Sequence, residues 1–198
     1  MTTIADIRAR IRKDLHDTDA SSYHWPDSQL DRHIERALDE LSLAIPQEKT
    51  LSVATTAGSR ELSLSSLEGP IDIEAVEFPI GDFPPTYVDF SRWSDTLTLN
   101  VEDLPSGETA AIFYTARQTL DVDNTSLPGS LEDLLCMGAA AFGALEQSVF
   151  TIDRLNTGDQ VASDYEAWGR ARLTAFTQLL YQHRRANRIR GRRLYRPA

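Results

Sequence analysis

The sequence of 198 residues contains one cysteine, Cys136, and no long apolar run. A single cysteine cannot close a disulfide within the chain, and it argues against a cysteine-based zinc site. No apolar stretch approaches the roughly 18 residues that a membrane helix needs. The N-terminal segment is charged and amphipathic, without the apolar core of a signal peptide. We therefore expect a protein that is made in a reducing cytoplasm and has no membrane partner.

Motifs of nucleotide binding and of hydrolysis are also missing. The ten glycines form neither G-x-G-x-x-G nor G-x-x-x-x-G-K, and the sequence contains no G-x-S-x-G and no H-E-x-x-H. The four histidines lack the spacing of metal ligands. Neighbouring acids, such as Glu132 and Asp133, are typical of a solvated surface unless burial shifts their pKa. We predict no enzymatic activity, no catalytic residue, no metal and no cofactor.

One polar segment resembles a calcium-binding loop. Four oxygen-bearing residues stand at positions 1, 3, 5 and 12 of such a loop: Asp121, Asp123, Thr125 and Glu132. However, Ser126 takes the sixth position, where the loop needs glycine, and Pro128 lies inside it. Glu132 is also well placed to cap the positive end of the following helix. We interpret the segment as a polar connector.

Charge is distributed unevenly along the chain. The formal net charge is −10, which argues against a general nucleic-acid binder. Residues 183–198 nevertheless hold seven arginines and no acid, so the remaining 182 residues carry a net charge of −17. The candidate binding residues of this arginine-rich segment are Arg184, Arg185, Arg188, Arg190, Arg192, Arg193, Tyr195 and Arg196. Arginine with tyrosine suits docking on an acidic protein surface, ahead of nucleic-acid contact or a solvated tail.

Apolar periodicity predicts helices at both ends of the chain. Ile4, Ile7, Ile11 and Leu15 form one stripe, with Thr3 and Asp6 as a capping pair. A second helix is predicted to end at Pro46, and two further helices cover 131–150 and 161–182. Asp27 or Ser28 is expected to cap the second helix, and Val161 is expected on the apolar face of the last. The 131–150 helix is rich in alanine and glycine, which favours close helix packing.

Between these helices the apolar residues no longer follow a helical period and instead alternate with polar residues, as in strands. About six short antiparallel strands are expected over 51–116, in a small sandwich or barrel with a bulge near Glu74–Ala75. The fold class is therefore α+β and mainly α, a helical bundle with an antiparallel β-rich insert and a basic C-terminal tail. The predicted divisions are 1–50, 51–118, 119–182 and 183–198. Trp25 is expected to pack as a hydrophobic staple at the entrance of the second helix and Trp168 in the core, and Trp93 is a candidate interface residue of the insert.

Three segments carry a family resemblance: Ile7–Leu15, Trp25–Leu30 and Ile34–Leu38. Together with the order of the helices and the insert, they resemble the head–tail connector (adaptor) proteins of tailed bacteriophages. The resemblance implies a ring, commonly of twelve copies, at the neck of the virion. Such a ring binds the portal protein above it and a tail or nozzle protein below it, and DNA passes through its lumen without specific binding.

The resemblance also implies that a C-terminal helix or tail docks on the portal, which corresponds here to residues 183–198. In this reading the alanine-rich helix provides the close contact between neighbouring subunits. Two alternatives stay open. One is another neck or tail-side ring protein, such as a stopper or tail-completion protein, and the other is a DNA-binding regulator.

Overall fold

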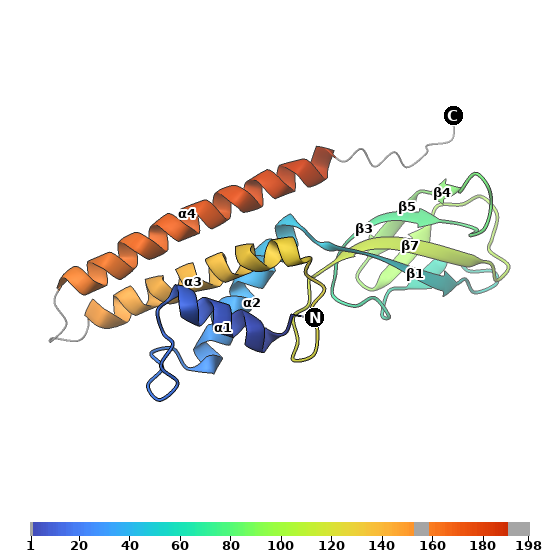
Figure 1. Ribbon diagram of the computed structural model, residues 1–198. Helices are drawn as coiled ribbons and strands as arrows, with labels where there is room; N and C mark the ends of the chain where they lie inside the picture. The colour runs from blue at the N-terminus through green and yellow to red at the C-terminus, as the bar shows by residue number, and fades with distance from the viewer. Residues whose placement is uncertain (1, 153–158, 190–198) are drawn as a thin grey trace. The chain divides into compact units, whose positions relative to one another are not determined.

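The computed structural model describes residues 2–152 and 159–189, with side chains except at 150–152, 159–160 and 186–189. These residues form two compact units, a helical unit of Met1–Ile45 and Gln118–Ile189 and a strand unit of Pro46–Arg117. Four helices and two antiparallel sheets lie within them, which confirms the mixed α+β class (Figure 1). None of the described helices is both long and apolar enough to cross a membrane.

Helix α1 (Ile4–Asp14) begins at the predicted cap. The Thr3 side chain accepts a hydrogen bond from the Asp6 amide, and the Asp6 carboxylate accepts one from the Thr3 amide. These reciprocal bonds satisfy two backbone N–H groups that a helix start would otherwise leave open. Ile7 and Ile11 are fully buried, so the apolar stripe faces the helical core as expected.

Helix α2 (Asp27–Ala44) begins differently from the prediction. Its N-cap is Pro26, and no side chain caps it. The Asp27 carboxylate is instead 2.7 Å from the guanidinium of Arg12 on α1. The predicted capping role of Asp27 or Ser28 is therefore wrong, because the charge of Asp27 is used to hold α1 and α2 together.

Arg12 is the centre of this connection. Its guanidinium donates to Asp17 Oδ2 at 2.6 Å and to the Trp25 carbonyl at 2.8 Å, and it stacks 3.5 Å from the centroid of the Tyr23 ring. Asp17 in turn accepts from the amides of His24 and Trp25. A buried charge is tolerated when each of its donors finds an acceptor, so this network fixes the loop that delivers Trp25 to the core.

Helices α3 (Gly129–Ile152) and α4 (Asp159–Ile189) pack closely within one chain. A Cβ at Gly138 would lie 2.8 Å from the Phe176 ring, and one at Gly169 would lie 2.9 Å from Leu145 Cγ. Ala139, Ala140, Ala141 and Ala144 are fully buried. The small residues of α3 therefore allow close packing within one chain, and the expected contact of this helix with neighbouring subunits stays a prediction.

The strand unit is a sandwich of two antiparallel sheets. One sheet has the order β1 (Gln47–Ala54), β7 (Thr109–Ala116), β3 (Pro70–Glu77), β4 (Tyr87–Val88), and the other has the order β2 (Glu61–Ser63), β6 (Thr96–Leu99), β5 (Phe90–Trp93). Side chains of both sheets share one apolar cluster, including Val76, Leu97 and Ile112. The shift in register between Ile73 and Ala75 confirms the predicted bulge.

Candidate interaction surfaces

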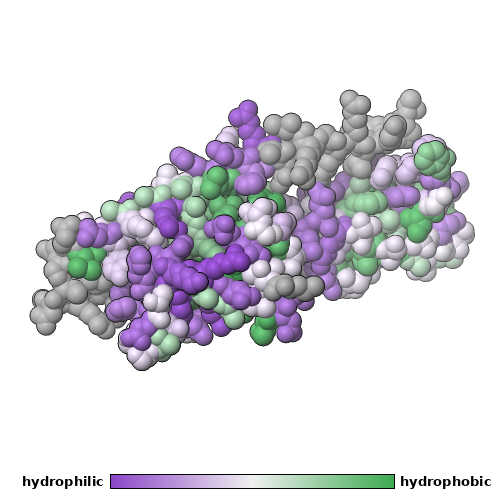
Figure 2. All heavy atoms as spheres, in the orientation of Figure 1, coloured by the Kyte–Doolittle hydropathy of each residue, from purple (hydrophilic) through white to green (hydrophobic). Residues whose placement is uncertain are grey.

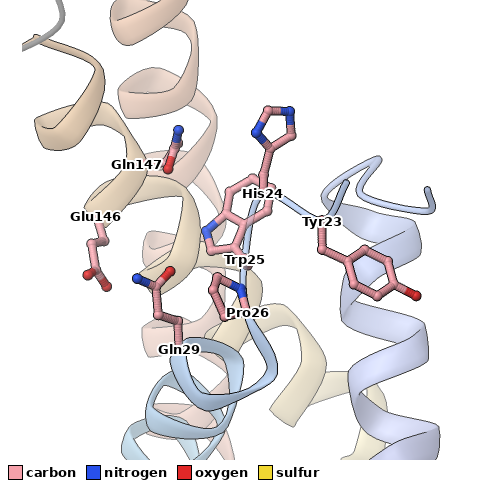
Figure 3. Close-up of a pocket in the computed structure, with 7 residues that line it drawn as sticks. All are labelled: Tyr23, His24, Trp25, Pro26, Gln29, Glu146 and Gln147. Carbon is pink, nitrogen blue, oxygen red and sulfur yellow. The ribbon is translucent and has the colours of Figure 1, made fainter. Parts of the chain in front are cut away.

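A pocket of about 300 Å³ lies between the α1–α2 connection and α3 (Figure 3). Its lining residues are Tyr23, His24, Trp25, Pro26, Gln29, Glu146 and Gln147. Glu146 is already engaged, since Arg32 donates to its carboxylate and His33 Nε2 lies 2.8 Å from Oε2. Figure 3 shows the ring of Tyr23 pointing away from Glu146. The acidic side chain in this lining, Glu146, is therefore already paired, and the pocket does not place it beside a nucleophile.

His33 is the one histidine among the described residues that is buried. Burial lowers the pKa of its imidazole, and the neighbouring carboxylate of Glu146 opposes that shift without overcoming it. The neutral ring packs within the helical unit beside Trp25 and Leu15, close to the backbone of Gly143. Its role is therefore structural at neutral pH.

The segment that resembles a calcium-binding loop, residues 121–132, uses its polar groups for contacts within the protein. Thr125 Oγ1 donates to the Thr119 carbonyl, and the Asp121 amide donates to the Asn124 carbonyl. Glu132 lies 2.8 Å from Arg10 of α1, so it is not a free ligand. Across residues 2–152 and 159–189, no three acids, histidines or cysteines gather as they would around a metal ion.

Cys136 also lacks the surroundings of a nucleophile. It is buried in α3, and this burial raises the pKa of its thiol to about 12. A thiol with that pKa stays protonated at neutral pH, and the thiolate is the reactive form. Cys136 is thus a core residue.

A second pocket, of about 390 Å³, lies between the end of α1 and the first turns of α4. Its lining residues are Asp14, Leu15, His16, Val161, Asp164, Tyr165 and Trp168. Val161 shares this pocket with Tyr165 and Trp168 on the predicted apolar face of α4, but it stays 44% exposed, whereas Trp168 packs against the core as expected. Asp14 is bound by Arg172 at 2.8 Å, which ties α4 to α1 beside the pocket.

Part of the arginine-rich segment continues helix α4. Arg184 and Arg185 are exposed on its last described turns, and α4 reaches past Arg188 to Ile189. Exposed arginines at a helix C-terminus are favoured by the helix dipole and remain free to meet a partner. The other predicted binding residues lie outside the described part of the chain: Arg190, Arg192, Arg193, Tyr195 and Arg196.

The strand unit presents two aromatic side chains to solvent. Trp93, at the turn between β5 and β6, is 86% exposed, in keeping with a candidate interface residue. Phe83, in the loop between β3 and β4, is 98% exposed. Phe83 lies between Gly81 and two prolines, and these turn residues keep its side chain at an exposed tip. Large exposed aromatics are typical of protein interfaces.

The described residues thus form a helical unit with an inserted sandwich, and they expose aromatic and arginine side chains without gathering a catalytic or metal-binding cluster. The family model described as SU10 adaptor protein matches residues 2–195. The chain therefore belongs to the SU10 adaptor protein family, and it is a structural phage adaptor, a class that is not enzymatic.

Other comparisons add little to this assignment. A chain in a solved structure described as the virion of a native gene transfer agent particle is similar at 15% identity, with a TM-score of 0.30. The similarity covers 84% of this chain and 88% of that chain. No curated protein sequence matches.

Proposed function

We propose that this adaptor forms a ring, commonly of twelve copies, beneath the portal protein at the neck of a tailed-phage virion. The ring extends the DNA channel from the portal and attaches a tail or nozzle protein. The observation that carries the proposal, beyond the family itself, is the arginine-rich end of α4. Arg184 and Arg185 project into solvent, and the residues after them contain five more arginines and no acid.

Guanidinium groups suit this role because they bond carboxylates and backbone carbonyls in a planar, two-pronged geometry. A portal surface that offers acids and free carbonyls would bind residues 183–198. We therefore assign portal docking to this segment, including Tyr195.

The charge of the remaining chain fits passage of DNA through the lumen. The strand unit, 46–117, carries twelve acidic and four basic side chains, a net charge of −8. Acidic walls repel phosphate and keep the genome from adhering. Trp93 is assigned to the contact between the strand unit and the tail-side component, because a single exposed tryptophan can anchor an interface.

Portal docking is tested with the full chain and a variant that ends at Gln182, each mixed with portal rings of the same phage. Light scattering should show the full chain adding a fixed number of copies to the portal peak, and the truncated chain adding none. A second variant with all seven arginines of the segment changed to lysine keeps the charge but loses the guanidinium fork. It should bind more weakly than the full chain.

Circular dichroism of the truncated variant checks that the body stays folded. Normal portal binding by this variant would disprove the docking role. Binding of short duplex DNA that weakens steeply with salt, without portal binding, would favour the regulator alternative.

A further inference from the structure

Three loops of the strand unit meet at one of its ends: residues 55–60, 78–86 and 100–108. The Ile80 amide donates to the carbonyl of Thr109, the first residue of β7, at 3.0 Å. The Gly58 amide donates to the Pro105 carbonyl at 2.8 Å, which joins the first loop to the third. These bonds hold the three loops at the same end of the unit, which we call the loop end.

The loop end exposes apolar side chains. Phe83 is almost fully exposed, Leu104 is 55% exposed, and Ile80 is exposed as well. The loop that carries Phe83 is closed at its base, where the Phe78 amide donates to the Thr86 carbonyl at 2.9 Å, and it contains three prolines, whose rings fix φ. An aromatic ring on a loop held in this way loses little conformational freedom on binding, which favours it as an interface anchor.

Acidic side chains accompany these apolar ones. The three loops contain four acids, all exposed: Asp82, Glu102, Asp103 and Glu108. Asp82 directly precedes Phe83, and Asp103 directly precedes Leu104. Within the described part of the chain, none of the four carboxylates forms an ion pair. Apolar and hydrophilic residues accordingly stand side by side on the face of the strand unit drawn in Figure 2.

The three loops hold one basic residue, Arg60, and its guanidinium is committed to the backbone. It donates to the Val101 carbonyl at 2.8 Å and to the Glu102 carbonyl. The loop end therefore has a net negative charge around its apolar side chains. Such a surface fits a protein that combines an apolar pocket with lysine or arginine, whereas DNA or the acidic strand unit of a second copy would bring like charge.

The loop end is separate from Trp93. In the antiparallel pairing of β5 with β6, Trp93 lies opposite Thr96 and Phe90 lies opposite Leu99. The Leu99 amide donates to the Arg60 carbonyl, so the Leu99 end of β6 adjoins the loop end. Trp93 therefore lies at the other end of β6, and the two exposed aromatic residues can meet different surfaces.

We propose that the loop end docks on another protein of the virion, with Phe83 in an apolar pocket and lysine or arginine side chains facing Asp82 and Asp103. The partner is defined by this chemistry, an apolar pocket with a basic rim. The inference rests on the proposed function for the presence of the adaptor in a virion. It adds a contact that is independent of Trp93 and of residues 183–198.

Photocrosslinking in purified phage particles tests the proposal. The adaptor carries Phe83→p-benzoylphenylalanine, the particles are irradiated, and the crosslinked peptides are identified by mass spectrometry. We expect crosslinks to one other virion protein, in a surface segment of net positive charge. Leu104→p-benzoylphenylalanine is a second probe of the loop end and should reach the same protein. Trp93→p-benzoylphenylalanine is the matched control in the same unit and should reach different peptides.

A charge reversal gives a second readout. Asp82→Lys with Asp103→Lys should lower the crosslink yield per adaptor copy at position 83 by about tenfold or more, because like charges across an interface are strongly unfavourable. Glu68→Lys with Asp95→Lys makes the same change in net charge at exposed positions outside the loop end. That variant should leave the yield unchanged.

The outcomes separate this inference from the proposed function. In particles that contain the variants, crosslinks from positions 83 and 104 to a second copy of this chain, to a segment of net negative charge, or to no protein would overturn the inference. An undiminished yield after the reversal at Asp82 and Asp103 would also contradict it. Absence of the unmodified adaptor from purified particles would instead overturn the proposed function.

Discussion

Arg12 and Asp17 form an ion pair in which both side chains are buried, with Nη1 and Oδ2 2.6 Å apart. The pair is only five residues apart in sequence, yet it organises the whole turn between α1 and α2. Arg12 reaches forward to the Trp25 carbonyl, and Asp17 accepts the amides of His24 and Trp25. Loss of Arg12 leaves the Asp17 carboxylate buried without a counter-ion, whereas loss of Asp17 still leaves Arg12 its contact with Asp27.

We predict that Arg12→Met lowers the free energy of unfolding by about 3–5 kcal/mol, because Asp17 then lacks its counter-ion. Urea denaturation followed by circular dichroism measures the change. Arg170→Ala, which removes an exposed pair with Glu166 one turn away, should cost no more than about 0.5 kcal/mol. An equal loss in the two variants would contradict the central role of Arg12.

Gly138→Ala should destabilise the helical unit by about 1–3 kcal/mol, because the new Cβ would overlap the Phe176 ring at 2.8 Å. Thermal unfolding measures the effect. Gly143→Ala in the same helix is the control, since its Cβ meets neighbours only at 3.5 Å or more. There the better helix propensity of alanine should leave stability equal or higher. Adding Phe176→Leu should recover part of the Gly138→Ala loss.

The stability of the helical unit should depend on pH through His33. Its folded-state pKa lies below the ordinary value of 6.5, because burial disfavours the charged ring. Below pH 6.5 the unfolded chain therefore binds this proton more readily than the folded one. Stability is fully present above pH 6.5 and decreases as the pH falls toward the folded-state pKa.

Urea titrations at pH 7.5 and 5.5 measure this dependence. His33→Gln should reduce the difference between the two pH values, whereas His183→Gln, at an exposed site on α4, should leave it unchanged. A pH dependence that survives unaltered in His33→Gln would assign it to other groups.

Cys136 should resist alkylation in the folded protein. With a pKa raised to about 12 and little solvent access, the thiol has almost no thiolate at pH 8. Iodoacetamide labelling followed by mass spectrometry should show negligible modification in buffer and complete modification in 8 M urea. Rapid labelling of the native chain would show that α3 opens readily.

Trp93→Ser and Phe83→Ser should leave the free energy of unfolding of the strand unit within about 0.5 kcal/mol of wild type, because neither side chain contributes to its core. Leu97→Ala, at a fully buried position in the same unit, should cost about 2–5 kcal/mol. A large loss from Trp93→Ser would mean that this side chain supports the fold and is not reserved for a partner.

Local signals in the sequence account for most of the elements. The Thr3–Asp6 cap, the apolar stripe of α1 and the bulge in β3 depend on neighbours within a few residues or on simple alternation, so they are visible without tertiary information. Strand β1 begins at Gln47, earlier than the predicted change of period at Leu51. Its first residues are polar, and only pairing with β7 makes them a strand.

The surfaces were harder to predict because exposure depends on what covers a residue. Val161 belongs to an apolar pattern but is 44% exposed at a pocket, and the sequence did not show that the small residues of α3 pack against Phe176 and Trp25 of the same chain. Phe83 and Tyr181 are aromatic, and composition alone does not tell a buried ring from an exposed one.

The sequence by itself determined the α+β class, the order of helices and strands, and the contrast between an acidic body and an arginine-rich end. These properties follow from periodicity, turn residues and charge, which act over short distances along the chain. Only the tertiary structure decided that Arg12 is a buried hub, that Phe176 of α4 packs against Gly138 of α3, and that Phe83 and Trp93 remain exposed. Each of these depends on contacts between segments far apart in sequence, where packing and desolvation select one arrangement of side chains.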